Sequence, residues 1–169
     1  MWNIRRFVIH EQPDVSRLQL PVLAPVSGRV CLLDEVPSPA YANGLFGAGI
    51  AIDLSGYKIQ APFDGVWLDH SVTGECLRIK SRQGLELLIQ VGIDSHKLMG
   101  QGFRSKSART GSFSQGETLL EFDLRLLKNR ARSAHCLVLT SQTQKLNAIQ
   151  AHCHSVLACQ EPCMTLHFR

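Results

Sequence analysis

The sequence has no apolar run approaching the roughly 18 residues that a membrane-spanning helix needs. It also lacks the pattern of a secretory signal, because residues 1–12 carry charges within their only apolar stretch and no small-residue cleavage site follows. We therefore expect a cytoplasmic protein. The six cysteines contain no CxxC pair, so reduced thiols are expected.

Strong charge is absent as well. The formal net charge is +4, and no basic stripe is interleaved with aromatic residues, which argues against a nucleic-acid-binding protein. Two small basic clusters are interpreted either as solvated surface or as docking points for an acidic partner. They comprise Arg104, Lys106 and Arg109, and Lys128, Arg130 and Arg132. The 169 residues and 44% hydrophobic content are typical of one globular domain.

The sequence does contain many short strand patterns separated by turn residues. Apolar or alternating runs recur at fairly regular intervals, and glycine, proline or serine bounds most of them. This punctuation predicts an all-β fold, either a sandwich or a barrel. The expected strands are 20–24, 29–33, 50–54, 66–70, 76–80, 85–91, 118–122, 136–140, 156–158 and 163–168.

One turn pattern occurs twice. Residues 24–28 read Ala-Pro-Val-Ser-Gly and residues 61–65 read Ala-Pro-Phe-Asp-Gly, and each precedes an apolar strand. Proline presets φ and glycine permits a positive φ, so each copy is expected to be a tight turn that leads into a strand. The repeat predicts two similar hybrid β-motifs folded onto each other.

Helical patterns are few. Residues 123–133 begin with Asp123 as an expected N-cap and end in basic residues, which suits the helix dipole. Residues 141–149 are expected to form a second short helix, with Ser141 as its cap and with Leu146 and Ile149 facing inward.

The first residues differ in composition from the rest of the chain. Residues 1–12 place Trp2 and Phe7 beside arginines, which is typical either of an amphipathic helix on a membrane surface or of a frayed terminus. We expect a flexible or amphipathic segment over residues 1–19 and one β-sandwich domain over residues 20–169.

Six segments are similar to a known family. They read LAPVSGRV, VPSPAYANGLFGAGIAI, APFDGVW, GLELLIQVGID, KLMGQGF and GETLLEFDLRLL. From about residue 20 to residue 166 the sequence resembles the glucose-type enzyme IIA phosphocarriers of the bacterial sugar phosphotransferase system, nearly without gaps. The resemblance implies an antiparallel β-sandwich with a few short helices, in agreement with the strand pattern.

The resemblance also identifies two departures at the family's active site. The family's signature has a histidine between an apolar triplet and an apolar residue followed by glycine, and residues 84–93 match it except that Gln90 replaces this histidine. A second family histidine lies 15 residues earlier, where this sequence has Glu75. The neighbouring Thr73 and Asp94 do match the family pattern.

These departures bear on chemistry. Phosphoryl transfer from a histidine needs a basic ring nitrogen with a free lone pair, whereas the nitrogen of the Gln90 amide is a negligible nucleophile. A carboxylate at Glu75 that came within about 4 Å of a transferring phosphoryl group would cost about 4 kcal/mol per charge pair at an effective dielectric constant near 20. That cost is roughly a thousandfold in rate. We therefore expect no catalytic residue at the usual site.

The family's docking face implies partners in the sugar phosphotransferase system, or regulated transporters and kinases. The residues expected to form the partner-binding face are Tyr41, Phe46, Thr73, Leu88, Val91, Asp94 and His96. The resulting hypothesis is a monomeric pseudoenzyme that acts as a binding or regulatory module.

Two alternatives stay open. In the first, His96 or His70 is a relocated acceptor and the protein is an active phosphocarrier in sugar uptake. In the second, the His152-Cys153-His154 pair, with Cys159 and Cys163 at strand ends around a turn, belongs to a zinc hydrolase, since two histidines on one face of a strand can ligate zinc. The sequence offers no persuasive upstream His and Asp ligands, so no metal or cofactor is expected.

Overall fold

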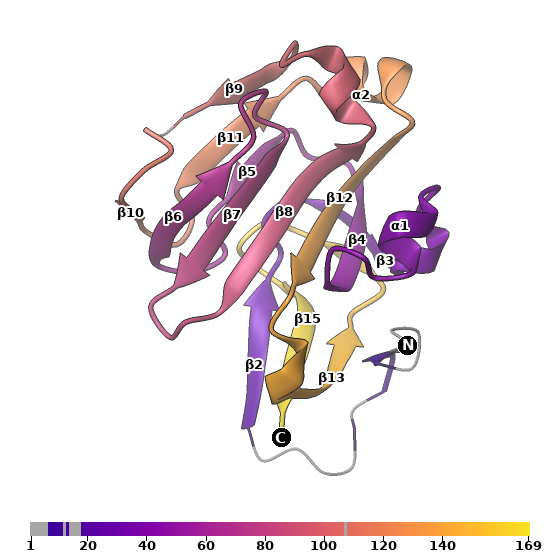
Figure 1. The fold of residues 1–169 in the computed structure, drawn as a ribbon, viewed down its shortest axis with the longest axis vertical. Coiled ribbons are helices and arrows are strands. Elements are labelled where there is room, and N and C mark those ends of the chain that lie inside the picture. Colours follow the sequence, from indigo (N-terminus) through magenta and orange to yellow (C-terminus); the bar gives the residue numbers. More distant parts are fainter. Residues whose placement is uncertain (1–6, 12, 14–17, 107) are drawn as a thin grey trace.

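The computed structural model describes residues 7–11, 13, 18–106 and 108–169, whose regular elements are mostly strands (Figure 1). The strands are β1 Val8–Ile9, β2 Leu18–Leu23, β3 Gly28–Cys31, β4 Ala48–Leu54, β5 Lys58–Gln60, β6 Gly65–His70, β7 Cys76–Ser81, β8 Glu86–Ile93, β9 Phe103–Ser105, β10 Ser112–Phe113, β11 Thr118–Phe122, β12 Ser133–Thr140, β13 Leu146–Ala151, β14 Ser155–Val156 and β15 Pro162–Phe168. The α-helices are α1 Pro39–Ala42 and α2 Leu124–Arg130, and the 3-10 turns are η2 Leu33–Glu35, η3 Ser95–Leu98 and η4 Thr143–Lys145.

These strands form three sheets. The largest has the order β10-β6-β7-β8-β12-β4-β3-β14, and its paired neighbours all run antiparallel. A second sheet has the order β1-β13-β15-β2, with β1 and β13 parallel, and a third has the order β5-β11-β9. The prediction of an all-β, antiparallel fold with few short helices is confirmed.

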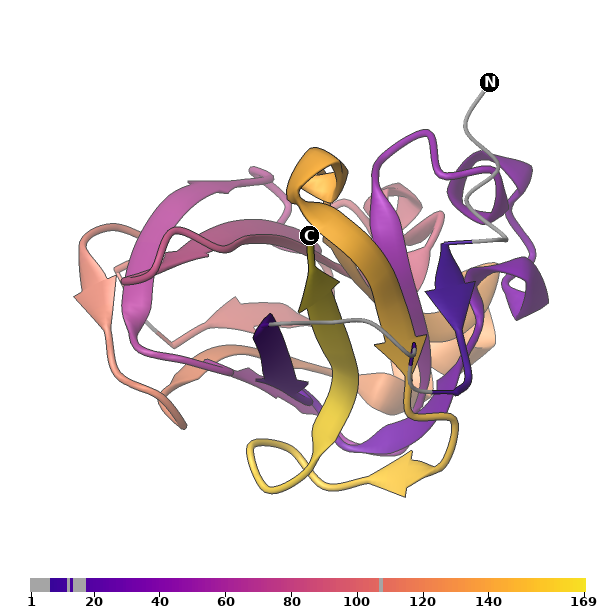
Figure 2. The same cartoon turned by 90° about the horizontal axis from the view of Figure 1, so that it is seen from below.

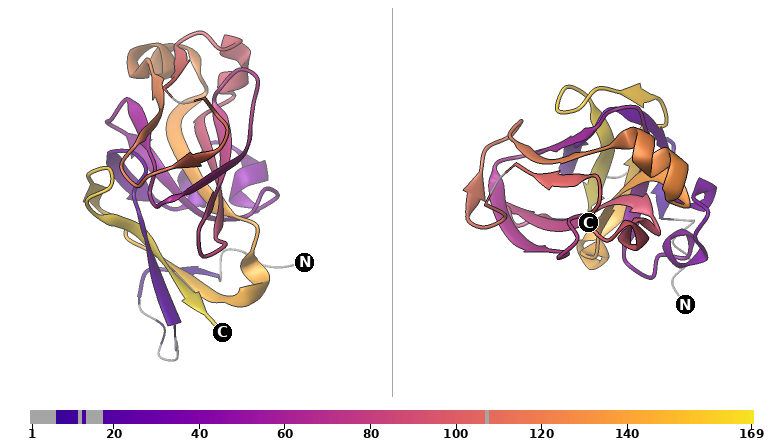
Figure 3. Two further views of the ribbon diagram at one scale, coloured as in Figure 1. Left: turned by 90° about the vertical axis from the view of Figure 1, so that its left-hand side faces the viewer. Right: turned by 90° about the horizontal axis from the view of Figure 1, so that it is seen from above.

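One apolar core joins the sheets. The fully buried side chains of Ile52 on β4, Ile89 on β8 and Leu166 on β15 belong to the same cluster. Figure 2 shows the strands curving around this interior, and Figure 3 shows α2 at one end of the molecule and the C-terminus at the other. A second, smaller cluster includes Leu33 and Leu137, with Tyr41 and Leu88 packed against it.

The repeated turn pattern does precede two strands, β3 and β6, but its glycines act differently from the prediction. Neither Gly28 nor Gly65 has a positive φ. A Cβ atom on Gly28 would lie 2.3 Å from the carbonyl oxygen of Asp53, and one on Gly65 would lie 2.2 Å from that of Lys80. Glycine is therefore required because the neighbouring strand passes directly beside the backbone.

The predicted helix over residues 141–149 is wrong. Residues 143–145 form the 3-10 turn η4, and β13 begins at Leu146 and pairs with β15. Leu146 and Ile149 are buried as expected, but a register shift between Leu146 and Ala148 lets both face the core from a strand. The apolar spacing predicts that Leu146 and Ile149 are buried, but it does not predict the pairing of β13 with β15.

The N-terminal prediction is only partly within the described residues. Residues 1–6, 12 and 14–17 lie outside them, so the segment boundary stays a prediction. Phe7 is buried, and Val8–Ile9 pair with Ile149 and Gln150 of β13 rather than forming a helix. In the described part of the chain, no helix is long and apolar enough to cross a membrane.

Candidate functional site

Gln90 lies on the central strand β8, between β7 and β12. It pairs with Cys76 on β7 and with Leu137 on β12. Because successive side chains of a strand point to opposite faces, Gln90, Cys76 and Leu137 share one face, while the buried Ile89 and Val91 point into the core. The sheet thus presents Gln90 outward at a fixed position.

Hydrogen bonds hold the Gln90 amide in place. Its Nε2 donates to the carbonyl oxygen of Gly92 at 3.1 Å and to Oγ of Ser95 at 3.3 Å. The Ser95 hydroxyl in turn donates to the carbonyl oxygen of Val91 at 2.6 Å. Gly92 has φ 80° and lies against Leu127 of α2, so no other residue fits this turn without strain.

Glu75 lies beside this strand, as the sequence predicted. Its backbone carbonyl accepts a 2.7 Å hydrogen bond from the N–H of Val91. The Glu75 side chain is only 6% exposed, and its Oε2 atom has no hydrogen-bond partner among the described residues. The turn before it is fixed by Ser71 Oγ, which accepts from the N–H groups of Gly74 and Cys76. The site therefore contains a buried carboxylate in a preformed turn.

Tyr41 and Phe46 form an aromatic pair near this carboxylate. Their ring centroids are 4.9 Å apart. Burial raises the pKa of the Tyr41 hydroxyl, and negative charge on Cys76, Asp94 and Glu75 raises it further. These three groups therefore lie close enough to Tyr41 to act on it electrostatically. Asp94 forms ion pairs with Lys97 at 3.7 Å and Arg132 at 3.9 Å.

Exposed apolar side chains accompany the site, and the sequence analysis missed three of them. Val72 is 93% exposed, Met99 is 81% exposed and Leu45 is 73% exposed, beside Phe46 at 47%. The backbone carbonyl of the half-buried Thr73 lies 3.3 Å from the Cβ position of Gly100, which brings the segment that carries Met99 beside the turn that carries Val72. In the sequence, Val72 directly precedes Thr73 and Met99 directly precedes Gly100, so an apolar residue beside a residue of a turn could have indicated them.

Two residues of the predicted partner-binding face lie deeper than expected. Val91 is fully buried, so the prediction that it faces a partner is wrong, because it points to the core side of β8. Leu88 is half-buried and packs against the smaller cluster that includes Leu137. The remaining predicted residues, Tyr41, Phe46, Thr73, Asp94 and His96, all retain exposed surface.

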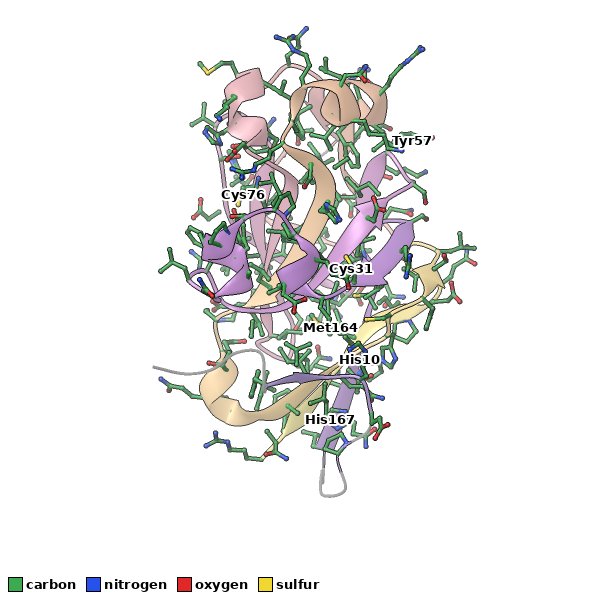
Figure 4. The ribbon with its side chains drawn as sticks, turned by 90° about the vertical axis from the view of Figure 1, so that its right-hand side faces the viewer. His10, Cys31, Tyr57, Cys76, Met164 and His167 are labelled. Carbon is green, nitrogen blue, oxygen red and sulfur yellow. The ribbon has the colours of Figure 1, made fainter. Side chains whose placement is uncertain are left out.

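Cys76 is a site residue that the sequence analysis did not single out. Burial, followed by the negative charges of Glu75 and Asp69, raises the pKa of its thiol to about 11. The thiol is therefore protonated near neutral pH and is a poor nucleophile. Figure 4 shows Cys76 in the upper part of the molecule, above Cys31.

The two candidate replacement histidines differ in geometry. His96 is exposed in η3, and its ring has no hydrogen-bond partner in the described part of the chain. His70 Nδ1 donates to the Ser71 carbonyl at 3.0 Å, which leaves Nε2 with a free lone pair. However, His70 pairs with Leu77, a core-facing residue of β7, so the strand register places it on the opposite face of the sheet from Gln90.

The His152 and His154 pair lies outside the strands. Both residues lie in the loop between β13 and β14, so they lack the shared strand face on which two such histidines can ligate zinc. His152 Nε2 contacts Oγ1 of Thr165 at 2.8 Å, while Cys159 and Cys163 donate to backbone carbonyls of Ala61 and Val22. No group of three or more potential metal ligands occurs within the residues that the structure describes.

A family model described as "phosphoenolpyruvate-dependent sugar phosphotransferase system, EIIA 1" matches residues 20–146. The chain is 30% identical over 141 residues to the PTS system glucose-specific EIIA component of Haemophilus influenzae, covering 83% of this chain and 85% of that protein. It is 31% identical over 129 residues to the component of the same name from Bacillus cereus, covering 76% and 78%.

A solved structure agrees in fold. The glucose permease IIA from Mycoplasma capricolum superimposes with a TM-score of 0.78 and 24% sequence identity. The similarity covers 88% of this chain and 96% of that one. The β-sandwich expected from the sequence resemblance is therefore the fold of the protein.

Proposed function

Because the chain belongs to the EIIA 1 family of the sugar phosphotransferase system, we propose that it acts there as a binding or regulatory module that takes no phosphoryl group at Gln90. The observation that carries this proposal is that hydrogen bonds already occupy the side-chain amide of Gln90. Its Nε2 donates to Gly92 and Ser95, and an amide nitrogen has no free lone pair to attack phosphorus.

Glu75 supports the same conclusion. A carboxylate beside Gln90 disfavours the approach of a negatively charged phosphoryl group. Glu75 also places a fixed carboxyl side chain in the site, in a family whose members carry a phosphoryl group only part of the time. We infer that the protein holds a single signalling state.

The surface around the site supports docking of other phosphotransferase-system proteins, or of transporters and kinases under their control. Leu45, Phe46, Val72 and Met99 expose apolar side chains, while Asp94 and the exposed His96 supply polar groups. An exposed apolar patch with a polar rim is typical of a protein–protein interface.

The second candidate function is phosphoryl transfer through His70. The Ser71 carbonyl fixes the His70 tautomer with its lone pair on Nε2, whereas no hydrogen bond among the described residues orients the His96 ring. The position of His70 on the other face of the sheet argues against this function, because a partner seated over Gln90 does not face the His70 ring. The two functions are separated by one labelling experiment.

The labelling experiment uses the full chain with phosphoenolpyruvate, enzyme I and the histidine-phosphocarrier protein. We expect the wild-type protein to remain unlabelled and the Gln90→His/Glu75→His variant to acquire acid-labile phosphohistidine. The Gln90→His variant alone is expected to label more slowly, because the Glu75 carboxylate remains. Label on wild-type His70 or His96 would refute the proposal.

Docking is tested separately by titrating the same phosphocarrier protein, unphosphorylated, into the chain. Tyr41→Asp and Phe46→Asp place a charge within the docking face and are expected to weaken binding at least tenfold. Tyr57→Asp is the matched control, since Tyr57 is 57% exposed and precedes β5, away from β8. Equal binding by all three variants contradicts the docking face.

A further inference from the structure

A cavity of about 310 Å³ lies at the opposite end of the large sheet from Gln90. It forms where the β7–β8 turn, η4 and the ends of β2 and β15 meet, toward the lower end of the molecule in Figure 1. We name it the basal pocket and define it by Leu20, Leu85, Lys145, Leu146 and Phe168. Five residues of extended strand separate Leu85 from Gln90, or about 17 Å, so the pocket is distinct from the docking face.

The basal pocket has an apolar interior. Leu85 and Leu146 are buried at 8% and 1% exposure and form its floor, while Leu20 and Phe168 are half-buried in its walls. A space with such walls favours an apolar occupant, because each apolar group that enters removes apolar surface from water.

The walls are fixed by hydrogen bonds rather than by the pocket's contents. Gln142 bridges the β7–β8 turn, accepting from the N–H of Glu86 at 2.9 Å and donating to the carbonyl oxygen of Gly84 at 3.0 Å. Arg169 donates to the carbonyl oxygens of Lys145 and Leu146, both at 3.1 Å. A binding site that is already formed loses little conformational freedom when a ligand enters.

The electrostatics of the pocket select the charge of the ligand. Lys145 is the one charged side chain among the described residues that line it, and it forms no ion pair with any of them. The nearest acidic neighbour along β8, Glu86, is engaged by Arg78 and Lys80 at 3.7 and 3.3 Å. A ligand with one anionic group therefore has a cation available to it at this end of the sheet.

From this geometry we propose that the basal pocket binds a free monocarboxylate with an apolar chain, with its carboxylate on Lys145 and its chain against Leu85 and Leu146. At about 30 Å³ for each water-sized group, the cavity accommodates about ten such groups. This corresponds to a linear chain of roughly eight to ten carbons. The assignment is independent of the function proposed for the Gln90 site.

The test is titration of the full-length protein with decanoate, followed by calorimetry and by amide chemical shifts. We expect saturable binding of one equivalent, with the largest shifts at residues 83–85 and 140–146. Lys145→Met keeps the apolar stem and removes the charge, and is expected to weaken decanoate binding about tenfold. It is expected to leave the binding of decan-1-ol unchanged.

Lys128→Met is the matched control, because Lys128 is an exposed lysine on α2 and does not line the basal pocket. Non-saturable shifts, shifts centred outside the pocket, or equal decanoate affinity in Lys145→Met and wild type overturn the proposal. So does binding that occurs only to phosphatidylglycerol vesicles and not to free decanoate, since the anionic group then belongs to a membrane.

Discussion

His167 is fully buried in β15, and its two ring nitrogens have different environments. Nε2 lies 3.2 Å from Oε1 of Gln150, and since that oxygen only accepts, Nε2 carries the proton. Nδ1 is buried without a hydrogen-bond partner in the described part of the chain. Figure 4 shows His167 below Met164, and both residues lie on β15 of the second sheet. The neutral ring fits this site, and a second proton on Nδ1 has no acceptor.

This environment predicts acid sensitivity. Burial lowers the pKa of His167 below the ordinary value near 6.5, so the unfolded chain takes up this proton at a higher pH than the folded protein does. The stability that His167 contributes is complete above about pH 6.5 and is lost as the pH falls toward the lower folded pKa. His167→Gln removes the titration and keeps a donor for Gln150. Melting temperatures at pH 8, 7, 6 and 5 are expected to fall less steeply in this variant.

His96→Gln is the matched control for that measurement, because His96 is exposed and contacts no other side chain through a hydrogen bond among the described residues. A His167→Gln variant whose melting temperature falls with pH as steeply as that of wild type contradicts the assignment. His152 remains in both proteins, and its pKa is also lowered, by burial first and then by His154 and His167. A residual slope is therefore expected.

The identity of individual site residues was more predictable than their depth. Gln90 and Glu75 are departures that a sequence displays directly, and the strand pairing confirms that they lie on adjacent segments. The burial of Glu75 Oε2 and the inward orientation of Val91 depend on what covers each residue. Such coverage comes from segments distant in sequence.

At the scale of the elements, the start of helix α2 is set by a side-chain hydrogen bond. Asp123 Oδ1 accepts a hydrogen bond from the N–H of Leu126 at 2.9 Å, as expected for an N-cap. The helix ends at Arg130, earlier than the predicted residue 133, because β12 begins at Ser133 and Arg132 bonds back to Ile93. Leu127 is buried against Gly92, so α2 also braces the turn beside Gln90.

Removing this cap is expected to destabilise the protein. Asp123→Ala leaves a helix N–H without its acceptor, and we expect a loss of about 1 kcal/mol in the free energy of unfolding, measured by urea denaturation. Asp123→Asn retains a side-chain oxygen and is expected to lose less than half as much. Equal losses in the two variants would mean that the negative charge at the helix start, rather than the cap hydrogen bond, is the important term.

Elements whose partners are distant were the hardest to predict. The three-residue strands β5 and β9 lack a strong alternating pattern, and each exists because it pairs with β11. Residues 141–149 had apolar spacing compatible with a helix, yet residues 146–151 pair with β15 as the strand β13. A pattern in one segment cannot reveal the strand that lies beside it.

At the scale of the whole molecule, the sheets share one core. β13 and β15 of the second sheet contact β4 of the large sheet, and the large cluster of buried residues includes members of all three sheets. A sheet that lost this shared core would expose a continuous apolar face to water. We therefore expect the described residues to unfold in one cooperative transition, without a stable isolated sheet.

Two truncations test this cooperativity. Ile89→Ala in the large sheet and Leu166→Ala in the second sheet each remove a fully buried side chain, and each is expected to cost about 2–5 kcal/mol. In a Trp2→Phe background, Trp67 fluorescence reports on β6 alone, while far-UV circular dichroism reports on all strands. If the core is shared, Leu166→Ala shifts the Trp67 transition and the circular dichroism transition to the same lower urea midpoint. A Trp67 transition that stays at the wild-type midpoint in Leu166→Ala, while circular dichroism shows an earlier second step, would establish that the sheets unfold separately.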